Sequence, residues 1–378
     1  MNLTETSAHG SSRCPEFSSK LSVDKTGRWI VERVSFHVVN RASEVAFQTL
    51  SNDGTKVIDT LTFGELGRRS DVLGGQIRQI GAGQRVGIFT DSCPLSVIAS
   101  IGILKANCSF SLLNPTLSAQ DLRFRVKLAG LSVLLTSSLS KSRLQSLLGT
   151  KAQICVKCGD IWGFKMESSK ELKRRWENEL CVVFTSGSTG RPKGVMCSSR
   201  GFKNRFEWML DAYPFEKGEV ALWYSSPHFV DSVWQMLGPL SGGIRTIICP
   251  RPLRLSPLPL AAALCSQKVT RMVATPTVYS MLEHLAWHVS KNLVPNLKVL
   301  ISSGEPLSEQ LAERLRKRFP KCRALLNLYG STETSADSTW YDFKIGMKQG
   351  PNLPNPSGYV PLGIPLPNTT LYPLPALG

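Results

Sequence analysis

Apolar and polar residues follow two spacings along most of the chain, one typical of helices and the other of buried strands. Apolar positions recur at helical spacing in residues 64–80, and the short apolar run 85–90 that follows is typical of a buried strand. Two more helical segments, 95–106 and 120–128, precede the strand-like residues 132–135. This alternation predicts a largely parallel sheet whose faces are covered by helices.

A second series of the same kind begins near Cys181. Short apolar runs predict further strands at residues 182–184, 220–224, 246–249, 271–274, 298–301 and 324–327. Apolar residues at helical spacing predict helices at residues 198–209, 258–265, 278–289 and 309–318. The predicted fold class is therefore α/β, with two successive α/β subdomains that contain largely parallel sheets.

Changes in residue pattern give the expected domain boundaries. Residues 1–28 are polar, rich in serine and without periodicity, so we expect a disordered leader there. Residues 29–178 and 179–344 are the two predicted α/β subdomains. Pro and Gly become frequent after residue 344. We expect residues 345–370 to begin a third subdomain and residues 371–378 to form an irregular tail.

Composition adds little to this picture. A net charge of +17 favours an anionic partner, but no nucleic-acid-binding motif accompanies the charge, so we expect no nucleic acid partner. Ten cysteines without a repeated spacing, and an N-terminus without the apolar core of a secretory signal, indicate a reduced, cytoplasmic compartment. The leader leaves import into an organelle open. No apolar run approaches the roughly 18 residues of a membrane span, so none is expected.

The ten residues from Thr185 to Gly194 carry the strongest chemical signal. They read T-S-G-S-T-G-R-P-K-G and follow an apolar, strand-like run. Glycines allow backbone N–H groups to approach an anion, hydroxyls add donors, and the lysine adds a positive charge. The spacing differs from that of a Walker A loop. We predict a polyphosphate-binding loop, whose candidate residues are Thr185, Ser186, Gly187, Ser188, Thr189, Gly190 and Lys193.

This segment resembles the phosphate-binding signature of adenylate-forming (AMP-binding) enzymes, T-S-G-[ST]-T-G-x-P-K-G. That superfamily includes acyl-CoA synthetases, luciferases and the adenylation domains of peptide synthetases. Residues 327–333, N-L-Y-G-S-T-E, are similar to a second family motif, N-x-Y-G-x-T-E. Weaker similarities at residues 61–66, 104–115 and 303–307 extend the resemblance over most of the chain. The overall pattern is most similar to the branch that activates amino acids or β-alanine and to some plant acyl-activating enzymes.

The resemblance implies roles for the residues of both motifs. Tyr329 would stack on adenine and Asn327 would reach its exocyclic amine. Thr332 would contact the α-phosphate, and Glu333 would hold Mg²⁺. The expected catalytic residues are therefore Lys193, Thr332 and Glu333.

Nucleotide binding would extend to neighbouring positions. The loop of Ser303, Gly304 and Glu305, in which Ser303 replaces the first glycine of the family's loop, would lie with its backbone against the adenine. Gly330 and Ser331 complete the second motif and belong to the same expected site.

The resemblance implies ATP-dependent activation of a carboxylate, which could be an amino acid or a fatty or other organic acid. The carboxylate attacks the α-phosphorus of Mg·ATP, which gives an acyl-adenylate and releases pyrophosphate. In complete relatives a thiol of coenzyme A or of a phosphopantetheine carrier then takes the acyl group. The expected ligands are ATP, Mg²⁺ and a small-molecule carboxylate, and the expected partner is a carrier domain.

The segment F-V-D-S-V-W at residues 229–234 resembles the F-D-x-S-V-W segment of peptide-synthetase adenylation domains. Candidate substrate-binding residues are His228, Phe229, Val230 and Asp231. In that family the Asp after Phe holds the α-amino group of the substrate. Here Val230 occupies that position and Asp231 follows, which changes the direction of the carboxylate. The shift disfavours an ordinary α-amino acid and leaves open a β- or longer amino acid, or a carboxylate without an amine.

The family continues with a Y-x-T-G-D motif and a small C-terminal lid domain that carries a catalytic lysine, and neither occurs in this sequence. We therefore expect a truncated form that lacks the lid and is a poor or inactive synthetase. A second interpretation is a catalytically incomplete nucleotide-binding form with a regulatory or interaction role. Both interpretations share the ATP site, and only turnover separates them.

Overall fold

The computed structural model describes residues 27–81, 85–149, 153–166, 178–187, 190–288, 296–319, 321–346 and 357–372. The expected leader therefore lies outside the described residues up to residue 26, as do Ser188 and Thr189 of the predicted phosphate loop. Residues 347–356 and 373–378 also lie outside them, so the expected third subdomain and tail are described only in part.

One sheet has seven strands in the spatial order β6-β7-β5-β3-β4-β8-β9. Its inner pairs β5–β3, β3–β4 and β4–β8 are parallel, and its outer pairs are antiparallel. The bounds of its strands are β3 Arg85–Phe89, β4 Ser109–Leu113, β5 Val133–Ser137, β6 Ile154–Cys158, β7 Ile161–Lys165, β8 Glu179–Thr185 and β9 Lys193–Ser198.

The other sheet has nine strands in the order β16-β15-β14-β13-β12-β10-β11-β1-β2. It is parallel from β14 to β1, and antiparallel strands complete both edges. The bounds of its strands are β1 Val45–Leu50, β2 Val57–Thr62, β10 Val220–Trp223, β11 Arg245–Ile248, β12 Arg271–Ala274, β13 Val299–Ser302, β14 Ala324–Ser331, β15 Ala336–Asp342 and β16 Ile364–Pro365. Two sheets with parallel centres confirm the predicted α/β class.

The helices connect the strands. Their bounds are α1 Arg28–Asn40, α2 Phe63–Gln79, α3 Pro94–Lys105, α4 Ala119–Ala129, α5 Ser138–Leu148, α6 Ser199–Ala212, α7 Asp231–Ser241, α8 Arg251–Arg254, α9 Pro257–Ser266, α10 Pro276–His288, α11 Glu309–Arg318, the 3-10 turn η2 Thr332–Thr334 and α12 Phe343–Gly346. In the part of the chain that the structure describes, no helix combines the length and the apolarity needed to cross a membrane.

Hydroxyl side chains fix where several helices begin. Thr62, Ser118, Ser137, Ser198 and Ser308 precede α2, α4, α5, α6 and α11, and each hydroxyl accepts a hydrogen bond from a backbone N–H of the first turn. Such caps stabilise a helix because its first N–H groups lack partners within the helix.

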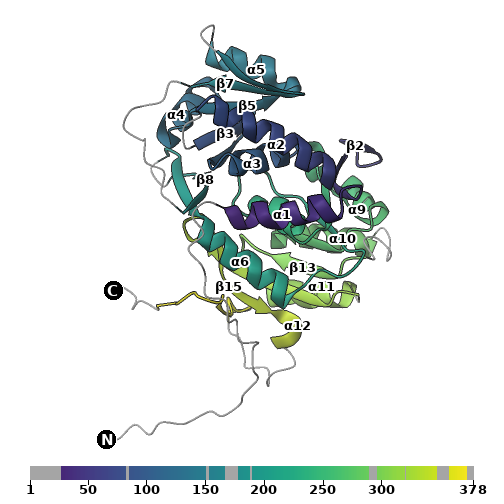
Figure 1. The fold of residues 1–378 in the computed structure, drawn as a ribbon. Helices are drawn as coiled ribbons and strands as arrows, with labels where there is room; N and C mark the ends of the chain where they lie inside the picture. Colours follow the sequence, from purple (N-terminus) through teal and green to yellow (C-terminus); the bar gives the residue numbers. More distant parts are fainter. Residues whose placement is uncertain are drawn as a thin grey trace, which may run out of the picture.

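Burial on both faces explains the apolar runs of the central strands. In β13, Val299 and Ile301 face one hydrophobic core while Leu300, between them, faces another. The first core fills the space between the two sheets together with residues of α1, α2, α3, α6 and α7. Two outer cores lie under α9, α10 and α11 on the nine-stranded sheet and under α4 and α5 on the seven-stranded sheet. Figure 1 shows α4 and α5 on one side of the molecule, α10 and α11 on the other, and α1 between them.

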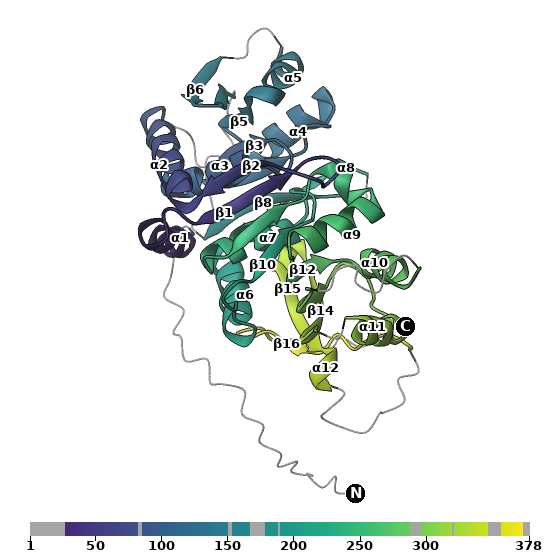
Figure 2. The same ribbon diagram turned by 90° about the vertical axis from the view of Figure 1, so that its right-hand side faces the viewer.

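Each of the two sheets contains strands from both sides of residue 178. The N-terminal strands β1 and β2 join the nine-stranded sheet beside β11, although they precede residue 178. The strands β8 and β9 follow residue 178 but extend the seven-stranded sheet beyond β4. The sheets therefore do not divide at residue 178 as expected, because pairing partners are chosen by long-range packing that the local pattern does not record (Figure 2).

A buried ion pair ties three strands of the seven-stranded sheet together. Arg85 of β3 donates two hydrogen bonds to Glu179 of β8, from Nε at 2.8 Å and from Nη2 at 2.6 Å. Ser109 of β4, which lies between these strands, also donates to Glu179. The exposed fractions of the two charged side chains are 5% and 0%, so neither charge can be hydrated if its partner is removed.

We predict that Glu179→Ala lowers the free energy of unfolding by about 3–5 kcal/mol, because it leaves the Arg85 guanidinium buried without its carboxylate. Urea denaturation followed by circular dichroism measures this change. The matched control is Glu32→Ala, which breaks the exposed ion pair between Arg28 and Glu32 and should change stability little. Similar losses of stability in both variants would contradict the view that Glu179 joins the strands through a buried ion pair.

Candidate functional site

The predicted phosphate loop is the turn of a hairpin at the edge of the seven-stranded sheet. Thr185 ends β8 and pairs with Lys193, which begins β9. Gly190 has a φ of 78°, a conformation that favours glycine, and its N–H donates to the carbonyl of Gly187 at 3.0 Å. A Cβ atom on Gly187 would lie 2.0 Å from the carbonyl oxygen of Arg191, so this turn requires glycine there.

The described polar side chains on either side of the hairpin's tip are open to solvent. Ser186 and Lys193 are exposed, and Thr185 is half-buried, whereas the preceding residues of β8 are buried. The buried strand β8 therefore ends in a glycine-containing turn, and Lys193 lies directly after that turn, at the start of β9. This arrangement offers backbone donors and a positive charge to an anion.

The second motif occupies the end of β14 and the turn η2. Asn327 is buried within the sheet, while Tyr329 is 55% exposed. The pairing of β14 with β15 shifts register between Tyr329 and Gly330, and a Cβ on Gly330 would lie 1.8 Å from the carbonyl oxygen of Ala336. Glycine therefore permits the bend that exposes the aromatic ring.

The end of the second motif is open to solvent. Ser331 and Glu333 are exposed, and Thr332 is half-buried. Glu333 lies in η2, with no ion pair to a basic side chain within the described ranges. Its carboxylate is the type of oxygen ligand that Mg²⁺ prefers.

Two contacts bring the motifs together from different sheets. The Cys197 Sγ–H of β9 donates to the carbonyl of Thr332 at 3.6 Å. One residue further along, the backbone N–H of Ser198 donates to the Ser335 hydroxyl at 3.0 Å. A Cβ on Gly201 would lie 2.9 Å from the Ser335 side chain, so α6 also packs closely against this turn. The strand β9, which leads away from the phosphate loop, thus meets the Glu333 turn at its far end.

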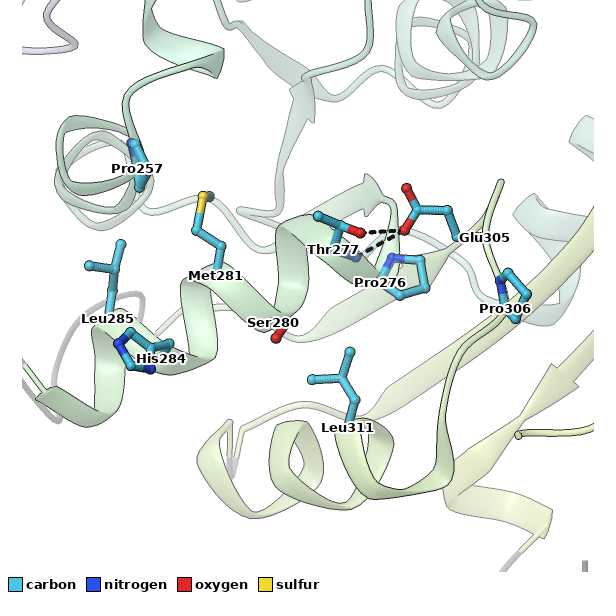
Figure 3. Close-up of a pocket in the computed structure, with 10 residues that line it drawn as sticks. All are labelled: Pro257, Pro276, Thr277, Ser280, Met281, His284, Leu285, Glu305, Pro306 and Leu311. Atoms are coloured by element: carbon cyan, nitrogen blue, oxygen red, sulfur yellow. Dashed lines mark hydrogen bonds between the residues drawn. The ribbon is translucent and has the colours of Figure 1, made fainter. Parts of the chain in front are cut away.

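The loop after β13 lies beside the second motif. Ser303 is buried, and Gly304 has a φ of 86° that favours glycine. The exposed Glu305 accepts hydrogen bonds from the backbone N–H of Thr277 at 3.2 Å and from its hydroxyl at 2.6 Å. Figure 3 shows these bonds, which engage the Glu305 carboxylate at the beginning of α10. The backbone of this loop, rather than the Glu305 side chain, remains available to a ligand.

Asn327 is oriented by the segment that carries β16. Its Nδ2 donates to the carbonyls of Pro361 at 3.0 Å and Val360 at 3.4 Å. An amide whose N–H groups are engaged in this way offers its oxygen as an acceptor, which is the group that an exocyclic amine needs.

An open pocket of about 750 Å³ lies between α10 and α11. Its lining is largely apolar and includes Pro257, Met281, Leu285 and Leu311 (Figure 3). Among the predicted nucleotide-binding residues that the structure describes, Glu305 alone lines this pocket. The pocket is therefore adjacent to the site that the two motifs form and is not that site.

The predicted substrate-binding residues lie in the loop between β10 and α7. Phe229 is exposed, Val230 packs partly against the core between the sheets, and Asp231 is the first residue of α7. Burial lowers the pKa of His228 to about 4, so its imidazole is neutral at pH 7. A neutral imidazole can hydrogen-bond a ligand without adding charge.

Polar contacts hold this loop in place. The Gln235 side-chain oxygen accepts from the backbone N–H groups of Tyr224 and Ser225, both at 2.8 Å. Arg254 of α8 crosses to the other sheet, where Nη2 lies 3.0 Å from an Asp91 carboxylate oxygen. The loop that carries Asp231 is thus fixed to both sheets.

A buried ion pair of α6 and β15 acts electrostatically on the half-buried Asp231. Arg205 Nε of α6 donates to Asp337 Oδ2 of β15 at 2.6 Å, and the Ser303 hydroxyl lies 3.5 Å from Asp337 Oδ1. Burial and the nearby Asp337 carboxylate raise the pKa of Asp231 to about 7, against the opposing effects of Arg205 and Ser303. Two carboxylates thus share the charge of one guanidinium.

Arg205 and Asp337 were missed by the sequence analysis. One signal existed for Arg205: it interrupts the buried face of α6 between Phe202 and Phe206. Asp337 carries no local signal, because it follows the second motif by only a few residues and resembles an ordinary turn carboxylate. Pairing with Gly330 across β14 and β15 places it beside the nucleotide motif.

Comparison with known proteins identifies the family to which the chain is similar. The model of the AMP-binding enzyme family matches residues 36–374. Zwittermicin A synthase ZmaJ of Bacillus cereus is 31% identical over 319 residues, which are 83% of this chain and 59% of that protein. The beta-alanyl-bioamine nonribosomal peptide synthetase ebony of Drosophila melanogaster is 35% identical over 215 residues, which are 55% of this chain and 24% of that protein. The chain thus spans less than two thirds of either relative.

Solved structures share the fold. The nonribosomal peptide synthetase FmoA3 in its AMPPNP-bound form superposes with a TM-score of 0.72 and 22% identity over 89% of this chain and 34% of that chain. The family model covers most of the chain, including the phosphate loop and the Glu333 turn. The chain therefore belongs to the AMP-binding enzyme family.

Proposed function

We propose that this chain forms the nucleotide- and substrate-binding part of a ligase that activates a carboxylic acid by adenylation, and that the acid carries an amine beyond its α-carbon. The observation that carries the proposal is the junction of the two motifs. Cys197 and Ser198, at the end of β9 away from the phosphate loop, join this strand of one sheet to the Thr332–Ser335 turn of the other. Family membership and the names of the peptide-synthetase relatives support the same reaction class.

The residues present fit Mg·ATP. The glycine turn at 186–192, from which a Cβ on Gly187 is excluded, offers backbone donors, and Lys193 adds the charge that β- and γ-phosphates need. The exposed ring face of Tyr329 suits a flat base. Glu333 would supply a carboxylate to Mg²⁺, and the cation would neutralise phosphate charge.

In this reaction the residues position the two substrates and neutralise phosphate charge, and none of them forms a covalent bond to a substrate. A carboxylate oxygen of the acid bonds to the α-phosphorus, and the bond from that phosphorus to pyrophosphate breaks. Negative charge accumulates around the phosphorus in this step, so preorganised hydrogen-bond donors stabilise the transition state. Lys193 and the turn hold the leaving pyrophosphate, and Thr332 lies on the α-phosphate side. Transfer of the acyl group to coenzyme A or to a carrier thiol is the step we propose next, supported by the peptide-synthetase relatives.

The charged cluster defines the acid. Asp231 and Asp337 carry one more negative charge than Arg205 neutralises when all three are ionised, and a buried excess charge calls for a cationic partner. A substrate ammonium is such a partner. Val230 occupies the position where a carboxylate would meet an α-amino group, so the amine must lie further along the substrate. β-Alanine is the smallest acid of this class, and the beta-alanyl specificity in the name of ebony supports it.

Lys193→Ala should weaken the binding of a non-hydrolysable ATP analogue with Mg²⁺ by about 1.5–3 kcal/mol, because it removes a charge-assisted contact. Isothermal titration calorimetry measures the change. The matched control is Lys56→Ala, which removes an equal charge from the exposed turn between β1 and β2. Equal affinities of the wild type and the Lys193 variant would show that the phosphate loop is not part of the ATP site.

Asp231→Asn should reduce β-alanine-dependent ATP–pyrophosphate exchange by the full-length protein about 10- to 100-fold, since an amide cannot neutralise the substrate ammonium. Asp59→Asn on the exposed strand β2 is the matched control and should leave exchange unchanged.

The same assay discriminates between acids. A strong preference of the wild type for α-alanine over β-alanine, lost in Asp231→Asn, would contradict the proposed substrate class, although it would leave the adenylation reaction intact.

A further inference from the structure

We propose that Arg125 of α4 is a further phosphate-binding residue, whose guanidinium contacts the β- and γ-phosphates of ATP and stabilises the departing pyrophosphate. Arg125 lies outside both sequence motifs, in a helix to which the sequence analysis assigned no role. This inference rests on the proposed function, because it adds a second cation to the same ATP site.

The Arg125 guanidinium lies against the hairpin that carries the phosphate loop, beside which α4 packs (Figure 1). Its Cζ atom is 4.8 Å from the centroid of the Phe184 ring, and Phe184 directly precedes Thr185 in β8. Phe184 pairs with Gly194, the last residue of the phosphate signature, and a Cβ on Gly194 would lie 3.3 Å from Phe184 Cε1. An aromatic face attracts a cation and restricts its movement, so Arg125 is held at the base of the phosphate loop.

Arg125 and Lys193 lie on different faces of this hairpin. Phe184 belongs to the outer core under α4, whereas the adjacent Val183 belongs to the core between the sheets. Because side chains alternate along a strand, Thr185 and its pairing partner Lys193 are on the inner face, opposite to Phe184. Phosphates at the turn would therefore have a cation on either side, which suits a group that carries several negative charges.

The charge of Arg125 is not matched by an ion pair in the part of the chain that the structure describes. Its Nε is buried without a hydrogen-bond partner, and its two Nη groups, which also have none there, remain accessible. Asp121, one turn earlier on α4, attracts Arg125, but its carboxylate accepts from the Ser118 hydroxyl at 2.7 Å. A partly desolvated cation without a counter-ion is costly, so the free donors of Arg125 indicate an anionic ligand.

Arg125 also acts on the loop that carries the predicted substrate-binding residues. Burial lowers the pKa of His228 to about 4, and the positive charge of Arg125 acts in the same direction. The other arginine that acts on His228, Arg254, is paired with Asp91 at 3.0 Å. Arg125 is thus the cation with free donors between the phosphate hairpin and this loop, within the described residues.

The test compares a nucleotide that has β- and γ-phosphates with one that lacks them. Calorimetry measures the binding of a non-hydrolysable ATP analogue with Mg²⁺, and of AMP, to the full-length protein. Arg125→Gln should weaken binding of the analogue about 10- to 100-fold, because it removes a charge-assisted contact, and should change AMP binding less than about twofold. An arginine that only packs on Phe184 would not distinguish the two nucleotides.

Lys127→Gln is the matched control, since Lys127 is exposed on the same helix and carries an equal charge. It should leave both affinities unchanged. Arg125→Met covers the case in which Arg125→Gln does not fold, because its apolar chain can still pack on the Phe184 ring. It should show the same selective loss of affinity for the analogue, and thermal unfolding checks the folding of each variant.

The outcomes separate this inference from the proposed function. A wild-type protein that does not bind the ATP analogue would contradict the proposed ATP site and, with it, the role of Arg125. A wild type whose affinity for the analogue falls in Lys193→Ala but not in a folded Arg125 variant would contradict only the role of Arg125. Equal losses for the analogue and for AMP in the Arg125 variants would overturn it as well, since the guanidinium would then have no preference for the β- and γ-phosphates.

Discussion

The contact between the hairpin of β8 and β9 and the turn after β14 is the constraint on which the rest of the site depends. The hairpin belongs to the seven-stranded sheet and the turn to the nine-stranded sheet. Hydrogen bonds from Cys197 to Thr332 and from Ser198 to Ser335 join them. Ser198 also caps α6, which carries Arg205 to the substrate side. A single seam between the sheets therefore sets the relative positions of the phosphate loop, the Glu333 carboxylate and the ion pair of Arg205 with Asp337.

Buried ion pairs serve two purposes in this molecule. Arg85 with Glu179 joins two strands, and Arg271 of β12 pairs with Glu219, which directly precedes β10; the carboxylates of both pairs are neutralised within the fold. Arg205 with Asp337 is buried to a similar degree but stands beside a further carboxylate, Asp231. Because burying an unmatched charge is costly, an excess of one carboxylate at an otherwise apolar junction indicates a place for a ligand.

Much of the fold could be predicted from the sequence, since the helices α2 and α11 carry apolar residues at helical spacing and the strands β3, β12 and β13 are short, mostly apolar runs. The exchange of β1, β2, β8 and β9 between the sheets could not, because strand pairing depends on contacts far apart in the chain. The nucleotide residues were found through two motifs whose spacing carries their chemistry. Arg205 and Asp337 were not predicted, because α6 and β15 bring them together only in the folded chain. A charged residue on the apolar face of α6 was nevertheless a usable signal for Arg205.

The central claim is that the seam between the sheets binds Mg·ATP while the cluster behind it binds the amine of the acid. A crystal structure of the full-length protein with β-alanine, Mg²⁺ and a non-hydrolysable ATP analogue tests it most directly. The account predicts phosphates at the turn of residues 186–192, Mg²⁺ at Glu333, and the ammonium between Asp231 and Asp337. Nucleotide density in the apolar pocket between α10 and α11, or an ammonium directed away from both carboxylates, would contradict it.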